Sequence, residues 1–188
     1  MTILLHDQLT LKKEDHLFLL GDYVHRGPDS EGVIETIIHL QEQGYPVHAI
    51  MGNHEEMYID DDLREFSPKA ESWIRNLPFY LETVDYYFVH AGFNYDRIDP
   101  LEDKRSMIWG AWTNTQPSKE FLQGKKVVHG HEIFHIELIK EAIRNDDALI
   151  PLDNGCYKGS RGDDWHGLGN LCALDLDTLE LHVQEYVG

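Results

Sequence analysis

The chain has 188 residues, and its 34 Asp and Glu side chains outnumber its 16 Lys and Arg side chains, giving a formal net charge of −18. This charge repels phosphate backbones and excludes a broadly nucleic-acid-binding surface. Hydrophobic residues make up 41% of the chain, enough to bury a core, which excludes a disordered protein. The sequence has no apolar run of membrane-spanning length and no signal peptide, so we expect one cytoplasmic domain over residues 1–188.

Four apolar runs typical of β-strands end at polar residues. The runs cover residues 16–20, 47–51, 86–89 and 127–128, and the residues that follow them include Asp22, Asn53, His90 and His131. Between the first two runs, residues 33–41 have the apolar spacing of a helix, with Asp29 or Ser30 as its N-cap. A strand–helix–strand unit of this length pairs its strands in parallel, so Asp22 and Asn53 are expected at one edge of a sheet.

The other segments are predicted from weaker patterns. Residues 55–77 are expected to be helical with an interruption at Ser67-Pro68, and Glu55 and Glu56 are expected to complement the helix dipole. The turn-rich stretch 93–118 is expected to cap a site with Trp109 and Trp112. Strands are predicted over residues 79–83 and 86–89, and strands of a second sheet over residues 133–139, 148–152, 171–176 and 179–183.

The polar residues at the four strand ends form a recognisable set of ligands. They comprise one carboxylate, one carboxamide and two imidazoles, from Asp22, Asn53, His90 and His131. Mixed oxygen and nitrogen donors suit manganese, iron or zinc better than calcium. The sequence therefore predicts a divalent metal site at the edge of a sheet.

Four motifs occur in a fixed order along the chain: Gly21-Asp22-Tyr23-Val24-His25-Arg26-Gly27-Pro28, Gly52-Asn53-His54-Glu55, His90-Ala91-Gly92 and Gly130-His131. Each motif alone is weak evidence, but the ordered set closely resembles the calcineurin-like metallophosphoesterases, in particular bacterial relatives of the phosphoprotein serine/threonine phosphatases. The resemblance implies an α/β sandwich of two mixed β-sheets flanked by helices. It also implies hydrolysis of phosphate monoesters by water activated between two metals, with a phosphoprotein or a small phosphoester as substrate.

The resemblance also implies a role for each motif residue. Asp22 would bridge two metals, and Asn53, His90 and His131 would complete the ligands of the second metal. Manganese is the expected metal, with iron or zinc as alternatives. Arg26 would grip phosphate oxygens and His54 would act as the general acid, while His25 and His129 would support these residues without contacting a metal.

The chain departs from the family pattern at its start. The family's first strand, which carries a D-x-H motif with two ligands of the first metal, has no counterpart, and residues 1–7 look like the latter half of the helix that follows that strand. We therefore expect a domain truncated at its N-terminus, with one complete metal site and one incomplete site. A start codon placed too late, a shortened paralogue or folding that depends on a partner would explain the difference.

Two further departures concern individual side chains. His25 stands where the family has an aspartate that supports the catalytic histidine, and an imidazole cannot stabilise an imidazolium at His54 in the same way. Ala111 stands where close relatives carry a second phosphate-binding arginine in a W-x-R pattern. Three arginines are candidates to replace it: Arg97, Arg105 and Arg161.

These departures leave two alternatives to a protein phosphatase. Hydrolases of dinucleoside polyphosphates share all of the motifs, so such a substrate is the alternative within enzymes. A pseudophosphatase that binds phosphate, metal or a protein partner without turnover is the alternative outside enzymes. An assay with both kinds of substrate, together with metal analysis, distinguishes these possibilities.

Overall fold

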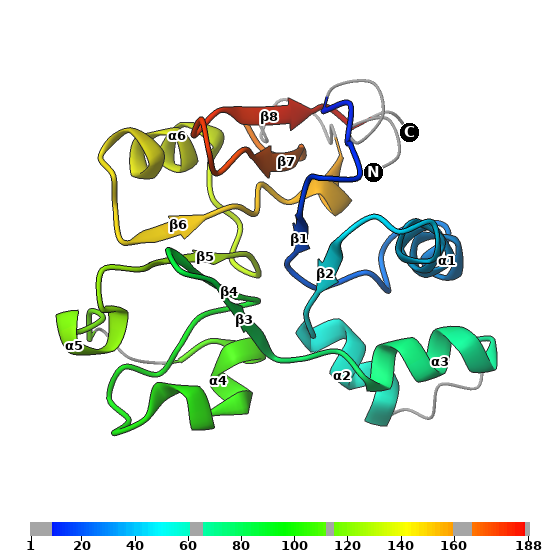
Figure 1. The fold of residues 1–188 in the computed structure, drawn as a ribbon, viewed down its shortest axis with the longest axis horizontal. Coiled ribbons are helices and arrows are strands. Elements are labelled where there is room, and N and C mark those ends of the chain that lie inside the picture. Colours follow the sequence, from blue (N-terminus) through cyan, green and yellow to red (C-terminus); the bar gives the residue numbers. More distant parts are fainter. Residues whose placement is uncertain (1–8, 61–65, 112–114, 160–166, 187–188) are drawn as a thin grey trace.

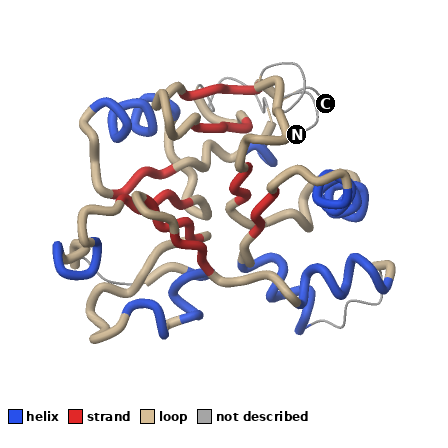
Figure 2. The backbone as a smooth tube through the Cα atoms, viewed as in Figure 1, coloured by secondary structure: helices blue, strands red, loops and turns tan. Residues whose placement is uncertain are grey.

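The computed structural model describes residues 9–60, 66–111, 115–159 and 167–186. Most strands lie in the middle of the molecule with helices at its left, right and lower sides, and the last two strands lie at its upper edge, as Figures 1 and 2 show. Within the described residues the strands form a two-stranded, a four-stranded and a second two-stranded ladder. The predicted α/β class with flanking helices is confirmed.

The first unit is the predicted strand–helix–strand, made of β1 (Leu17–Leu19), α1 (Ser30–Glu42) and β2 (Val47–Ala49). The two strands are parallel, as predicted. Asp29 is the N-cap of α1, and its side chain accepts the Gly32 N–H at 2.8 Å, which satisfies one of the unpaired N–H groups of the first turn. Four apolar residues of α1 are buried: Ile34, Ile37, Ile38 and Leu40.

Two helices follow β2 and are separated where the sequence predicted an interruption. They are α2 (Asn53–Asp60) and α3 (Pro68–Arg75). Ser67 caps α3 by accepting the Ala70 N–H, and Pro68 occupies the first turn, where a missing N–H costs nothing. α3 packs on α1 through Ile74, which is fully buried in a cluster with Val24, Ile34 and Ile38.

The four-stranded sheet contains β3 (Tyr80–Glu82), β4 (Tyr86–Val89), β5 (Lys126–His129) and β6 (Leu149–Pro151). β3 is antiparallel to β4, whereas β4, β5 and β6 are parallel, so these three strands end at the same edge. The stretch predicted to be rich in turns contains η2 (Pro100–Glu102) and α4 (Lys104–Trp109), followed by α5 (Lys119–Leu122). Phe18 of β1 stacks on Phe88 of β4 at 4.0 Å, which joins the two-stranded unit to this sheet.

Two predictions for the C-terminal part are wrong. Residues 133–139 are not a strand, because α6 (Ile136–Arg144) begins there with His135 as its N-cap. The helix buries Ile139 and Ala142 and exposes Glu137 and Glu141, which is the pattern of an amphipathic helix. In addition, β6 pairs with β5 in the four-stranded sheet rather than with the later strands.

The chain ends in an antiparallel pair, β7 (Leu171–Leu174) and β8 (Leu181–Gln184), after the short helix η3 (Cys156–Lys158). The largest buried cluster lies between the four-stranded sheet and α4, and it includes Val89, Met107, Ile108 and Val127. None of the described helices has the length and apolar character needed to cross a membrane.

Candidate active site

The loops that carry the motifs contain unusual backbone conformations. Asp22, His25, Arg26 and His131 have φ values of 59°, 65°, 63° and 69°. Residues with a Cβ avoid this left-handed region, at a cost on the order of 1–3 kcal/mol each. Four of the eight such residues in the described chain therefore lie in the motif loops, where the fold holds side chains in directions that regular structure does not provide.

Two glycines let the loops after β1 and β2 approach each other. A Cβ on Gly21 would lie 2.8 Å from both the Cα of Gly52 and Nδ1 of His90. A Cβ on Gly52 would collide with the side chain and backbone nitrogen of Asp22 and would lie 2.8 Å from Oε2 of Glu55. Both positions therefore require glycine if Asp22 is to stay next to the start of α2.

The Glu55 side chain connects the same two loops by accepting hydrogen bonds from their backbone N–H groups. Its Oε2 accepts the N–H groups of Asp22 and Gly52, both at 2.9 Å, and its Oε1 accepts those of Tyr23 at 2.7 Å and Val24 at 3.2 Å. The side chain is fully buried, and this burial raises the pKa of the carboxyl to about 7. Glu55 thus accepts backbone N–H groups from both loops of the site, which is a larger role than the predicted interaction with the helix dipole.

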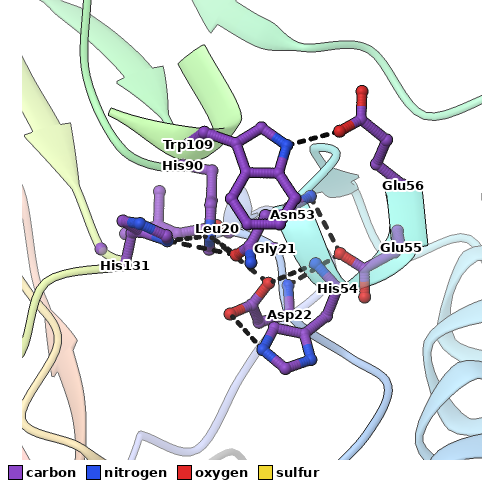
Figure 3. A network of polar contacts seen from close by, with 12 residues as sticks. Leu20, Gly21, Asp22, Asn53, His54, Glu55, Glu56, His90, Trp109 and His131 are labelled. Atoms are coloured by element: carbon purple, nitrogen blue, oxygen red, sulfur yellow. Dashed lines mark hydrogen bonds and ion pairs between the residues drawn. The ribbon is translucent and has the colours of Figure 1, made fainter. Parts of the chain in front are cut away.

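The four predicted ligands converge at the edge of the sheets (Figure 3). Nε2 of His90 lies 3.0 Å from Oδ1 of Asn53, 3.2 Å from Nδ1 of His131 and 3.4 Å from Oδ1 of Asp22. Nδ1 of His131 lies 3.1 Å from the same Asn53 oxygen. The expectation that these four side chains meet is confirmed by the geometry.

The contacts of His90 determine which of its ring nitrogens carries the hydrogen and which presents a lone pair to the cluster. Its Nδ1 lies 2.7 Å from the carbonyl oxygen of Leu20, which can only accept, so Nδ1 carries the hydrogen. Burial lowers the pKa of His90 and favours the neutral ring, so Nε2 presents a lone pair. That lone pair points at the oxygens of Asn53 and Asp22, which carry lone pairs themselves.

Such a group of converging lone pairs fits a cation. A tetrahedral site with metal–ligand distances of about 2.0–2.1 Å has ligand–ligand distances of roughly 3.3–3.4 Å, close to the 3.0–3.4 Å measured between these atoms. In the part of the chain that the structure describes, no three His, Cys, Asp or Glu side chains could hold a metal by themselves. The Asn53 oxygen, 3.0 and 3.1 Å from the two imidazole nitrogens, would be the fourth donor of a site here.

The predicted general acid lies next to this cluster. Nε2 of His54 is 3.9 Å from Oδ2 of Asp22, and the His54 backbone N–H donates to Oδ1 of Asp22 at 3.2 Å. Nδ1 of His54 lies 2.7 Å from Nδ1 of His25, whose ring stacks on Tyr58. Burial lowers the pKa of His54 most, the charges of Arg26, His25 and His131 lower it further, and Asp22 opposes them.

Two predicted residues contact aromatic side chains outside the ligand cluster. The guanidinium of Arg26 stacks on the exposed ring of Tyr157, 4.2 Å from its centroid. His129 contacts the ring of Phe134 and the Gly130 carbonyl, and burial lowers its pKa. Three further expectations lie outside the described residues: Trp112, Arg161 and the segment 1–7.

The structure adds one residue that the sequence did not single out for the site, Asp153, and gives a contact for one that it did, Trp109. Asp153 follows β6, and burial raises its pKa, while the neighbouring charges of His90 and His131 lower it. Its position after the third parallel strand of the four-stranded sheet was the available signal. Trp109, for which groove and packing roles were equally plausible, donates its Nε1–H to Oε2 of Glu56 on α2 (Figure 3).

The fold and this cluster define an α/β protein with oxygen and nitrogen donors gathered at the carboxyl ends of its strands. A family model described as calcineurin-like phosphoesterase matches residues 2–174, so the chain belongs to the calcineurin-like phosphoesterase family. Its relatives are hydrolases, and membership of the family implies divalent metal ions as cofactors.

Similarity to individual relatives covers shorter segments. The chain is 34% identical over 59 residues to a zinc-dependent endopolyphosphatase of Saccharomyces cerevisiae, which is 31% of this chain and 16% of that protein. It is 32% identical over 95 residues to a symmetrical bis(5'-nucleosyl)-tetraphosphatase of Chromobacterium violaceum, and 31% identical over 94 residues to one of Nitrosomonas europaea. These matches cover 42% of this chain and 33% and 34% of the relatives, so the chain spans at most about a third of their length.

Proposed function

We propose that this protein hydrolyses phosphate esters with the help of a divalent metal bound by Asp22, Asn53, His90 and His131. The observation that carries the proposal is the set of four contacts of 3.0–3.4 Å that connect the donor atoms of these side chains. The metal is proposed to be manganese, with iron or zinc as alternatives, because this donor set suits all three. When bound, such an ion activates water and offsets charge on the phosphoryl group.

The chain's own residues would bind the phosphate and move the proton. Arg26, in the loop after β1, offers a planar set of N–H donors that matches phosphate oxygens. His54 would donate the proton to the leaving oxygen through Nε2, because its Nδ1 is occupied by His25. The left-handed backbone at His25 and Arg26 supports this role, since such strain is typical of functional loops.

Phosphoserine and phosphothreonine proteins are the first candidate substrates. Dinucleoside polyphosphates are the second, and the observation that favours them is the identity with two bis(5'-nucleosyl)-tetraphosphatases. Side-by-side assays with a phosphopeptide and with diadenosine tetraphosphate decide between them. Binding of either substrate without turnover would favour the pseudophosphatase instead.

The test of the proposal is metal analysis of the purified protein together with manganese-supported hydrolysis of para-nitrophenyl phosphate. Asn53→Ala is expected to lose both metal and turnover, because its Oδ1 contacts both imidazoles of the cluster. Asn145→Ala, at the exposed C-cap of α6, is the matched control and is expected to keep both. An Asn53→Ala protein that keeps its metal would contradict the proposed ligand set.

A further inference from the structure

An aromatic ring lies against the arginine that is proposed to bind phosphate. The guanidinium carbon of Arg26 is 4.2 Å from the centroid of the Tyr157 ring. The other contacts between a cation and an aromatic ring in the described part of the chain measure 5.0–5.9 Å, so this one is the closest. Such a contact is attractive because the positive charge lies over the negative face of the ring.

The contact joins two loops that border the candidate active site. Arg26 lies in the loop after β1, next to His25, whose Nδ1 is 2.7 Å from Nδ1 of His54. Tyr157 lies in η3, in the loop after β6, and β6 is parallel to β5, the strand that precedes His131. The contact therefore connects the loop beside the proposed general acid to the loop beside a proposed ligand.

The loop that carries Tyr157 is held in place by a buried side chain. Asn154 is 1% exposed, and its Nδ2 donates to the carbonyl oxygens of Phe134 at 2.9 Å and Gly167 at 2.8 Å. Its Oδ1 accepts the N–H of Asn170 at 3.0 Å. The Tyr157 side chain itself is 42% exposed, so it is a surface ring on a well-anchored loop.

Arg26 is held much less firmly. Its side chain is exposed, and no carboxylate among the described residues pairs with it. Arg97, by comparison, has its Nε 3.3 Å from the carboxylate of Asp103. A long side chain loses rotamer freedom when it binds a ligand, and this loss weakens binding. The contact with Tyr157 restricts the Arg26 guanidinium before a ligand arrives.

The ring contact and phosphate binding use different parts of the guanidinium. A guanidinium that lies over an aromatic ring turns its flat side to the ring, while its N–H groups point outward in its own plane. Phosphate oxygens accept these in-plane N–H groups. Arg26 is therefore able to keep its contact with Tyr157 while it binds a phosphoryl group.

We propose that Tyr157 is a positioning residue that holds Arg26 in the orientation in which it binds the phosphoryl group. The inference rests on the proposed function for the role of Arg26, but the contact itself requires neither metal nor turnover. The aromatic face of Tyr157 is the part that acts, so phenylalanine should replace it and leucine should not. Loss of the contact is expected to weaken phosphate binding about two- to fivefold, as for an exposed cation–π contact.

The first test is NMR spectroscopy of the metal-free protein, with the Nε–H signal of Arg26 identified by its loss in Arg26→Lys. The ring current of residue 157 is expected to shift this signal upfield in wild type and in Tyr157→Phe, but not in Tyr157→Leu. Titration with inorganic phosphate is expected to move the signal, with binding about two- to fivefold weaker in Tyr157→Leu. NMR spectroscopy measures the weak binding expected without metal.

Tyr45→Leu is the matched control for this titration. It removes a ring that lies under Lys13 at 5.7 Å, between α1 and β2 and away from the loop of Arg26. This variant is expected to bind phosphate like wild type. Three results would overturn the inference: an unshifted Arg26 signal in wild type, no response of that signal to phosphate, or equal phosphate binding by wild type and Tyr157→Leu.

The second test is steady-state kinetics of the manganese-loaded proteins with para-nitrophenyl phosphate. In Tyr157→Leu, KM and the inhibition constant of phosphate are expected to rise about two- to fivefold with kcat nearly unchanged, because Arg26 would hold the phosphoryl group in both the ground state and the transition state. Tyr157→Phe and Tyr45→Leu are expected to keep the wild-type values. A Tyr157→Phe protein as impaired as Tyr157→Leu, or a loss confined to kcat, would contradict the positioning role. Absence of turnover by wild type would refute the proposed function, and the phosphate titration would still test Tyr157.

Discussion

The Nδ1 atoms of His25 and His54 lie 2.7 Å apart, so one imidazole donates a hydrogen bond to the other. This pairing holds the ring of His54 in place, as a carboxylate at position 25 would. It does not supply the negative charge that would stabilise a protonated His54. Burial, with the charges of Arg26 and His25, lowers the pKa of His54 and leaves its neutral form dominant near neutral pH.

Replacing the imidazole partner by a carboxylate should therefore increase turnover. In His25→Asp, the carboxylate would accept the His54 Nδ1–H and raise the pKa of His54, so more of the protein carries the proton for the leaving oxygen. We expect kcat with manganese for phosphoserine, whose leaving alkoxide must be protonated, to rise by about 100-fold, the lower end of the 10²–10⁴-fold range of general acid catalysis. The alkaline limb of the pH–rate profile should shift to higher pH.

His25→Asn is the matched control, because it has nearly the shape of the aspartate variant without its charge. We expect no increase in kcat for this variant. Metal content and circular dichroism must equal those of wild type for the comparison to hold. If His25→Asp bound its metal, stayed folded and showed no gain in kcat, the description of the His25–His54 pair as an impaired dyad would be wrong.

Gly52→Ala tests whether the close approach of the two loops positions Asp22. The new methyl group would collide with the Asp22 side chain and backbone, and would lie 2.8 Å from Oε2 of Glu55. We expect the metal to be lost and the free energy of unfolding to fall by about 1–3 kcal/mol, the usual effect of overpacking. Metal analysis and urea denaturation measure the two effects.

Gly130→Ala provides the comparison for this steric argument. Its Cβ would lie 3.7 Å from its nearest neighbour, the His90 carbonyl oxygen, which is ordinary contact, and its φ is not left-handed. The variant is expected to bind metal like wild type although it lies at the same edge of the sheet. Equal metal loss in the two variants would show that any substitution at this edge impairs metal binding, and that the collision with Asp22 is not the cause.

The convergence of the four proposed ligand side chains could be predicted because it follows from strand direction. β1 is parallel to β2 and β4 is parallel to β5, so polar residues after each strand reach one edge whatever the details of the loops. The contact of His25 with His54 followed from the family resemblance. Both predictions depend only on topology and on motif position.

Features that depend on tertiary contacts were not predictable in the same way. Glu55 is buried because N–H groups from two distant loops point at it, and nothing in a carboxylate at a helix start indicates this. A strand was predicted over 133–139 because Ile133 and Ile136 are β-branched. The helix begins after the His135 cap, and its apolar spacing becomes visible only from Ile139 and Ala142. Local composition was ambiguous there, and packing decided the outcome.

Glu55 also gives a prediction for pH dependence. Its pKa in the folded protein is about 7, above the ordinary value of 4.5 that applies to the unfolded chain. Folding therefore favours the protonated form, and the associated stability is present below pH 4.5 and is lost as pH rises through 7. A shift of this size corresponds to about 3 kcal/mol.

Histidines with a lowered pKa, such as His90, change the stability in the opposite direction over the same pH range. The effect of Glu55 is therefore measured as the difference in stability between wild type and a variant. Urea denaturation of metal-free wild type and Glu55→Gln is expected to show the wild-type advantage shrinking by about 3 kcal/mol between pH 5 and pH 8. Glu137→Gln is the control, because Glu137 is exposed, its pKa is lowered by Lys140, and it titrates below this range. An advantage that is constant or grows with pH would show that the four N–H donors outweigh burial and keep Glu55 ionised.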